Sequence, residues 1–272
     1  MNERGLLRLG LLARTATLRA VGPIDFVCRL ASGRGHLPPL WLRRHAGPLA
    51  AYEGSARDTD EWIGRLGLVR DGDRVVDLGC GAGAMVEPLR RRIGARGTYV
   101  GLDVHGPSLS WASRHFGNDS RLTFDAVSAC SPYGRRNAAP AKRLTLPLAD
   151  RSVQFVLAKS LFTHLLEEEA SAYLAEIRRL LEPGRAALVT AFLFEPGSRV
   201  DRGLSRYFQH SEPGRPVRWR RRDRPQAAVA FERSHFVALA QQAGLWSPWI
   251  GRGFLPGDDD VPRGQDLVLL GA

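Results

Sequence analysis

Val75-Val-Asp-Leu-Gly-Cys-Gly-Ala-Gly83 is the stretch that decides the fold of this 272-residue chain. Its first residues read as a short buried strand over residues 74–78, and a helix is expected over residues 84–93. Between the two lies a loop with three glycines, Gly79, Gly81 and Gly83. Glycines at such a turn let the backbone bend tightly and let a ligand lie against the chain. The stretch therefore predicts a ligand-binding loop at the carboxyl end of a strand.

The glycine loop by itself fits two classes of ligand. Gly79, Gly81 and Ala84 satisfy the spacing of a dinucleotide fingerprint, and Asp103 lies where a ribose-binding acid would be expected. Asp77, however, is an acid within the strand, where it would repel a pyrophosphate and attract an ammonium group. The acid favours a cofactor with a positively charged group over a nicotinamide dinucleotide.

Strands and helices alternate on the carboxyl side of this loop, as a parallel sheet requires. Residues 167–181 form the clearest predicted helix, with acids at its start and Arg178 and Arg179 near its end. The predicted fold is an α/β, doubly wound, mostly parallel sheet of seven strands. We place these strands at residues 74–78, 98–103, 121–127, 153–158, 186–193, 246–250 and 266–270.

Composition predicts an N-terminal arm or cap over residues 1–55 and a core domain over residues 56–272. Within the core, residues 195–230 form an Arg-rich insert that we expect to act as a lid. Residues 1–57 contain nine arginines and three acids, and residues 199–224 contain the same numbers. Such clusters attract phosphates, carboxylates or anionic surfaces, although a solvated arginine face is an equally good explanation.

Several classes of protein are excluded or disfavoured. Cys28, Cys80 and Cys130 are far apart and offer neither a disulfide framework nor a metal site. No apolar run approaches the ~20 residues of a membrane-spanning helix, so we expect a cytoplasmic protein. The Leu- and Arg-containing residues 1–20 leave open a targeting segment or a helix on a membrane surface.

Four stretches together resemble the class I S-adenosylmethionine-dependent methyltransferases, which have a Rossmann-like fold. They are VVDLGCGAG, YVGLDVHGPSLSWA, LPLADRSVQFVLAKSLFTHL and YLAEIRRLLEPGRAALVTAF, and the resemblance covers about residues 58–195. It implies S-adenosyl-L-methionine as the cofactor. Within the class, the chain is most similar to methyltransferases of small molecules and glycans.

The resemblance also implies a role for each matching residue. Asp77 would lie near the methionine amino group, and the three glycines would give the backbone close approach to the cofactor. Asp103 would accept hydrogen bonds from both ribose hydroxyls. Val104 would press on the adenine, and Lys159 would form part of the cofactor wall through its backbone.

Three positions depart from the family's pattern. Gln154 stands where an acid is usual before the fourth strand, and Arg185 stands where a second glycine is usual. Asp125 comes slightly early for the acid that often contacts the adenine amine, and Ser128 is the second candidate for that contact. These departures bear on cofactor affinity rather than on the fold.

Methyl transfer from a sulfonium is an in-line displacement that needs a positioned acceptor and a route for one proton. His164 lies near the carboxyl edge of the predicted sheet and is the candidate general base, although a structural role is the stronger interpretation. Tyr133, Tyr207 and His210 are weaker candidates.

The expected acceptor is a small molecule or a glycan, and the arginine clusters favour an anionic one. The same clusters would also serve an RNA methyltransferase. Two further classes of protein fit parts of the pattern, namely a non-catalytic protein that binds the cofactor and a nicotinamide oxidoreductase.

Overall fold

A computed structural model describes residues 17–43, 52–128, 144–212, 214–251 and 264–272. The chain divides into two compact units, Met1–Ala56 and Arg57–Ala272. The division falls within helix α4 (Tyr52–Arg65). The assignment of residues 1–55 as a cap stays a prediction. Within the described residues, no helix combines the length and apolar character needed to cross a membrane.

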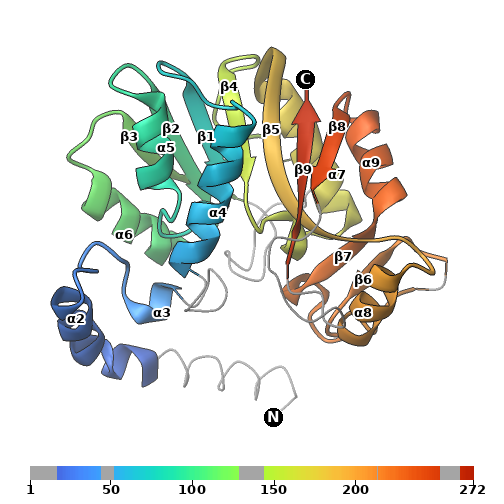
Figure 1. Ribbon diagram of the computed structural model, residues 1–272, viewed down its shortest axis with the longest axis horizontal. Coiled ribbons are helices and arrows are strands. Elements are labelled where there is room, and N and C mark those ends of the chain that lie inside the picture. Colours follow the sequence, from blue (N-terminus) through green and yellow to red (C-terminus); the bar gives the residue numbers. More distant parts are fainter. Residues whose placement is uncertain (1–16, 44–51, 129–143, 213, 252–263) are drawn as a thin grey trace. The chain divides into compact units, whose positions relative to one another are not determined.

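The larger unit is built on one mostly parallel sheet (Figure 1). Strands β2, β1, β4 and β5 are central, and β3 pairs in parallel with β2 at the edge. β9 pairs antiparallel with β5, and β8 pairs antiparallel with β9. The strands of this sheet are β1 (Arg74–Leu78), β2 (Thr98–Asp103), β3 (Leu122–Ala126), β4 (Val153–Ala158), β5 (Leu181–Phe194), β8 (Trp246–Gly251) and β9 (Asp266–Gly271).

The order of the parallel strands reverses at β1. From β1 the chain proceeds outward to β2 and β3, and then returns to β4 on the other side of β1. Ligands of open α/β sheets bind at such a switch point, outside the carboxyl ends of the strands. The doubly wound α/β fold predicted from the sequence is confirmed, and the glycine loop lies at its switch point.

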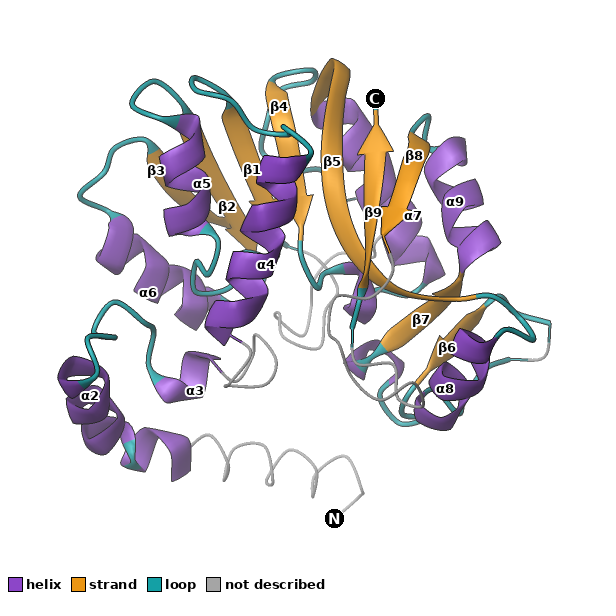
Figure 2. Ribbon diagram, viewed as in Figure 1, coloured by secondary structure: helices purple, strands orange, loops and turns teal. Residues whose placement is uncertain are grey.

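Helices cover both faces of the sheet (Figure 2). Helix α5 (Val86–Ile93) lies in front of β1 and β2, whereas α7 (Glu167–Leu180) lies behind β5 and β9. Helices α6 (Gly106–Phe116) and α9 (Arg233–Gln242) complete the layers. The side chains of Val75, Val76 and Phe155 between these layers are wholly buried. The burial explains why the central strands are almost continuously apolar.

Residues 195–230 are more regular than the sequence indicates. They contain helix α8 (Arg199–Tyr207), strand β6 (Val217–Trp219) and the short 3₁₀ helix η5 (Pro225–Ala227), and they lead into β7 (Val229–Glu232). β7 pairs in parallel with the end of β5, and β6 pairs antiparallel with β7. The described sheet therefore contains the seven predicted strands and two more, nine in all. β6 and β7 were missed because strands of three and four residues show no clear period.

The two departures in the central motifs have structural partners at the amino edge of the sheet. Gln154 accepts a hydrogen bond from the Arg74 amide at 2.7 Å and donates one to the Glu182 carboxylate. Arg185 lies 3.4 Å from the carboxylate of Asp73. Gln154 therefore links the starts of β1, β4 and β5, and Arg185 links β5 to the residue before β1, across β4. Both contacts lie at the edge opposite the glycine loop.

The smaller unit contains helices α2 (Gly22–Ala31) and α3 (Leu40–Arg43). Asp25 lies at its centre and accepts hydrogen bonds from Arg29 at 2.9 Å, from the Leu40 amide at 3.1 Å and from Arg43. The Arg29 guanidinium also donates to the Leu37 carbonyl at 2.6 Å. Charged hydrogen bonds thus join α2 to the segment that follows it.

Candidate cofactor site

The loop after β1 has the backbone conformation that its glycines predict. Gly79, Gly81 and Gly83 have φ values of +77°, +55° and +79°, which side-chain-bearing residues rarely adopt. A Cβ placed at Gly81 would meet no atom within 4 Å, so the space beside this residue is open to a ligand. At Gly83 a Cβ would lie 2.9 Å from both Phe116 and Val86. Gly83 therefore serves the packing of the loop, while Gly81 borders open space.

Asp103 is held in place by two backbone amides. Its Oδ2 accepts a hydrogen bond from Gly81 N–H and its Oδ1 one from His105 N–H, both at 2.7 Å. A carboxylate has about four lone-pair positions, so each oxygen retains the capacity to accept one hydroxyl. Burial raises the pKa of Asp103, and the two amides partly oppose this rise. The geometry suits the recognition of a ribose diol.

Asp77 is a buried acid directly before the loop. Only 2% of its surface is exposed, and its Oδ2 accepts a hydrogen bond from the Tyr99 hydroxyl at 2.8 Å. Burial raises the pKa of Asp77 to about 7, although Tyr99 and the positive charge of Lys159 lower it. A cationic ligand would favour the ionised form. Asp77 therefore fits the methionine ammonium group that the sequence assigns to it.

The turn after β4 closes the site on the other side. Lys159 follows the end of β4, and burial lowers the pKa of its ammonium group while Asp77 and Asp58 raise it. Ser160 has a φ of +59°, and its amide donates to the Thr190 hydroxyl at 2.7 Å. Strained backbone of this kind gathers at functional sites. The sequence assigned only the backbone of Lys159, whereas its charge also acts on Asp77.

His164 lies in the 3₁₀ helix η4 (Phe162–His164), directly after this turn. Its Nδ1 is 3.0 Å from the carbonyl oxygen of Gln226 in η5, and burial lowers the pKa of the imidazole. The Gln226 side chain donates in turn to Glu169 at 2.5 Å. His164 therefore joins the β4 turn to the insert. Its role as a general base stays a prediction.

The remaining predicted residues are less closely tied to the site. Val104 is half-buried and packs against the main core. Asp125 and Ser128 are both exposed on or beside the edge strand β3. The Tyr207 hydroxyl accepts a hydrogen bond from Arg220 at 2.6 Å, and the backbone of His210 pairs with that of Trp219. Tyr133 lies outside the described residues.

Tyr99 and Ser160 are site residues that the sequence reasoning missed. A tyrosine inside an apolar strand reads as core, and only its contact with Asp77 shows a polar role. Gly101 is the sequence signal for the position of the Tyr99 ring, because a Cβ at residue 101 would lie 3.1 Å from that ring. The conformation of Ser160 has no sequence signature.

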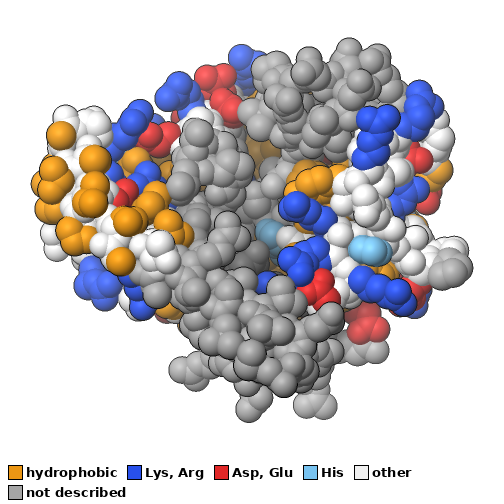
Figure 3. All heavy atoms as spheres, turned by 90° about the horizontal axis from the view of Figure 1, so that it is seen from below, with side chains coloured by type: hydrophobic (Ala, Val, Ile, Leu, Met, Phe, Trp, Pro, Cys, Tyr) orange, Lys and Arg blue, Asp and Glu red, His pale blue; other side chains and the backbone are white. Residues whose placement is uncertain are grey.

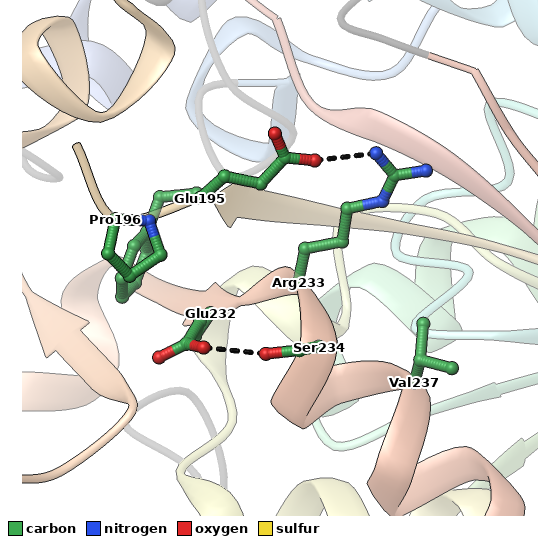
Figure 4. Close-up of a pocket in the computed structure, with 7 residues that line it drawn as sticks. Glu195, Pro196, Glu232, Arg233, Ser234 and Val237 are labelled. Carbon is green, nitrogen blue, oxygen red and sulfur yellow. Dashed lines mark hydrogen bonds and ion pairs between the residues drawn. The ribbon is translucent and has the colours of Figure 1, made fainter. Parts of the chain in front are cut away.

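A separate hollow of about 420 Å³ lies where β5 and β7 end, beside the start of α9 (Figure 4). Glu195 and Arg233 form an ion pair there at 2.6 Å, and Glu232 accepts a hydrogen bond from Ser234. The residues that line it are Phe194, Glu195, Pro196, Glu232, Arg233, Ser234 and Val237. None of them is a predicted site residue, and β7 is separated from β1 by β4 and β5. Within the described part of the chain, no cluster of His, Cys, Asp or Glu is suited to a metal ion.

These side chains fit S-adenosyl-L-methionine. An open glycine cradle, a fixed carboxylate and a buried acid meet at the switch point of the sheet. Together with the strand order, they define the class I methyltransferase fold.

Comparison with known proteins supports this class directly. Residues 76–189 match the family model described as a methyltransferase domain. The matched residues thus form a methyltransferase domain, in agreement with the resemblance seen in the motifs.

Two curated relatives match parts of the chain. Arsenite methyltransferase of Aquipseudomonas alcaligenes is 30% identical over 162 residues, which cover 58% of this chain and 41% of that protein. Ribosomal RNA large subunit methyltransferase E of Verminephrobacter eiseniae is 47% identical over 55 residues, or 20% of this chain and 21% of that protein. The matches thus span less than half the length of these relatives.

Solved structures share the fold. A SAM-dependent methyltransferase from Aquifex aeolicus has a TM-score of 0.52 and 15% identity, with 86% of this chain and 98% of that chain covered. The 1,6-didemethyltoxoflavin-N1-methyltransferase of Burkholderia thailandensis has a TM-score of 0.53 and 17% identity. That alignment covers 93% of this chain and 87% of that one. At these identities the likeness shows the fold alone.

Alanine substitutions should separate the two roles of the loop glycines. Gly83→Ala is expected to lower the free energy of unfolding by about 1–3 kcal/mol, because its Cβ would collide with Phe116 and Val86. Gly81→Ala should cost about 1 kcal/mol through its positive φ, and should mainly weaken binding of S-adenosylhomocysteine. Urea unfolding and calorimetric titration measure the two effects. Unchanged affinity in Gly81→Ala would show that no ligand approaches this residue.

Asp103→Asn is expected to weaken S-adenosylhomocysteine binding by about tenfold or more, because hydrogen bonds to a charged group contribute about 1.5–3 kcal/mol. Asp71→Asn is the matched control, since Asp71 is an exposed acid before the start of β1, at the edge of the sheet opposite the glycine loop. Calorimetric titration of both variants, with NAD as a second ligand, provides the test. Equal losses in the two variants would contradict the ribose-binding role.

The pKa of Asp77 predicts a pH-dependent affinity. The ionised fraction of Asp77 rises between pH 6 and 8, because its pKa is about 7. Binding of the S-adenosylhomocysteine ammonium group should therefore strengthen several-fold, up to about tenfold, over this range. Asp77→Asn should bind more weakly and lose this pH dependence. A wild-type titration that is flat with pH would refute the assignment.

Asp77 should also affect stability in the opposite sense to a salt-bridged acid. The folded state retains its proton between about pH 4 and pH 7, whereas the unfolded state releases it. Stability from this group is therefore lost as the pH rises through that window. Relative to Asp77→Asn, the wild-type free energy of unfolding should fall across the same range.

Proposed function

We propose that this protein transfers a methyl group from S-adenosyl-L-methionine to a small-molecule or glycan acceptor that carries negative charge. The reaction is an in-line displacement, with the protein positioning the acceptor. The observation that most supports this proposal is the contact between His164, after β4, and Gln226 of the insert (residues 195–230). This contact lies next to the candidate cofactor site. This contact supports a role for the insert in binding the acceptor.

The charge of the insert supports an anionic acceptor. Several of its arginines are already paired, because Arg218 bonds Asp201 and Arg221 bonds Asp223 at 2.9 Å. Among the described residues, Arg222 and Arg224 form no ion pair, and Arg224 directly precedes η5. A phosphate or carboxylate on the acceptor would supply their missing counter-charge.

The departures from the family's pattern do not support a decayed site. Gln154 and Arg185 are engaged at the amino edge of the sheet, and the carboxyl edge keeps the glycine loop, Asp77 and Asp103. This separation favours an active enzyme over a non-catalytic binding protein. A proton released by the acceptor could be accepted by His164, whose imidazole is kept neutral by burial.

Turnover with matched acceptor pairs tests the proposal. Release of S-adenosylhomocysteine would be measured with sugar phosphates, uronic acids and their neutral parent sugars at low and high salt. We expect turnover with charged members only, and Arg222→Gln/Arg224→Gln should raise KM about tenfold without changing S-adenosylhomocysteine affinity. Arg96→Gln/Arg151→Gln removes the same charge from exposed positions at the amino ends of β2 and β4, and should leave KM unchanged.

Two outcomes would overturn the proposal. Equal turnover of neutral and charged acceptors would contradict the proposal that Arg222 and Arg224 bind a negative charge on the acceptor. Tight, steeply salt-dependent binding of a structured RNA, with no turnover of small acceptors, would favour an RNA methyltransferase instead.

A further inference from the structure

Helix α2 has the reverse of the usual amphipathic arrangement. Its charged residues, Asp25 and Arg29, face inward, where their side chains are only 9% and 10% exposed. Its large apolar side chains face outward. The exposed fractions are 67% for Ile24, 51% for Phe26, 63% for Val27 and 55% for Leu30.

The inward charges are fixed by several partners. Asp25 bonds Arg29, Arg43 and the Leu40 amide, and Arg29 also bonds the Leu37 carbonyl. Rotating α2 to bury its apolar side would break this network and leave buried charges without partners, which is strongly unfavourable. The apolar side is therefore held outward by the structure of the smaller unit.

The apolar side chains form a continuous surface. Ile24 and Val27 are three residues apart, Phe26 and Leu30 are four apart, and such spacings place side chains side by side on a helix. Figure 3 shows hydrophobic side chains gathered over this part of the molecule, with Lys and Arg side chains nearby. A group of exposed large apolar residues on one short helix indicates a surface that meets another apolar phase.

The charge of the segment that contains α2 indicates which phase this is. Residues 1–57 contain nine arginines and three acids, which leaves an excess of six positive charges. Asp25 is already paired, and Glu53 lies 3.1 Å from Arg34. An apolar helix face on a segment with an excess of positive charge fits the interface of a bilayer that contains anionic lipids.

A second copy of the chain fits less well. Ten helical residues span about 15 Å, and one face of such a helix offers a few hundred Å². A stable protein interface buries about 800 Å² on each partner. A bilayer requires no such area, because an interfacial helix needs only to place its apolar face at the boundary between headgroups and acyl chains.

We propose that α2 docks this protein on an anionic membrane surface, with Ile24, Phe26, Val27 and Leu30 inserted among the lipids. The binding is peripheral and reversible, and it does not depend on the methyl acceptor. Insertion contributes the apolar part of the affinity. The excess positive charge of residues 1–57 contributes the electrostatic part, which salt weakens.

Sedimentation of the full chain with vesicles tests the surface. The vesicles would be phosphatidylcholine alone or with about 30% phosphatidylglycerol, an anionic lipid. We expect binding only to the anionic vesicles, with a decrease at high salt. Ile24→Ser/Val27→Ser should weaken it by about tenfold or more, whereas Trp246→Ser, which removes a comparably exposed side chain in the other unit, should not.

A fluorescent probe gives a readout specific to α2. Cys28 is exposed and lies four residues after Ile24, whereas Cys80 is buried. With Cys130 replaced by Ser, a polarity-sensitive dye on Cys28 should shift to shorter wavelength on anionic vesicles. S-adenosylhomocysteine affinity, measured in parallel, should be the same in all variants and reports that the other unit is folded.

Three results would overturn the proposal. They are no binding of the wild type to anionic vesicles, equal binding by Ile24→Ser/Val27→Ser, and vesicle binding without a shift of the dye on Cys28. A wild-type dimer that Ile24→Ser/Val27→Ser converts to a monomer, in the absence of lipid, would instead assign the surface to self-association.

Discussion

The hydrogen bond from Gly81 to Asp103 joins the ends of two neighbouring parallel strands, and the geometry of the cofactor site depends on it. The three glycines of the loop have no side chains with which to fix its shape. The carboxylate of Asp103 supplies an acceptor from β2, and its second oxygen is fixed by the His105 amide. One side chain thus sets both the loop that approaches the ligand and the acceptor for two hydroxyls.

The site also depends on charges that are costly without a ligand. Asp77 and Asp103 both have raised pKa values because they are buried, and the lowered pKa of Lys159 has the same cause. The Tyr99 hydrogen bond and the Lys159 charge only partly offset the burial of Asp77. A cationic ligand beside Asp77 would complete this compensation. Buried charges of this kind lower the stability of the ligand-free protein and raise its affinity for the ligand, as is common in pre-formed binding sites.

The sequence predicted most of the larger unit because its signals are local. The 74–78 strand, the glycines with positive φ and the acid of β2 each follow from residue type and spacing. Contacts across the fold have no such signal. The bond from Tyr99 to Asp77 and that from His164 to Gln226 join residues 22 and 62 positions apart. The seven predicted strands are all present, and β6 and β7 were missed because such short strands form only through their neighbour in the sheet.

The position of the insert follows from the length of β5. This strand has 14 residues, and its last part continues beyond β4 to pair with β7. Residues 195–230 were predicted to act as a lid, which would require them to move away from the site. The insert is continuous with the sheet through β7, and η5 is bound to His164 and Glu169. Any movement of the insert would therefore have to break the contacts of η5 while the pairing of β7 with β5 holds its other end. The role of these residues as a lid stays a prediction.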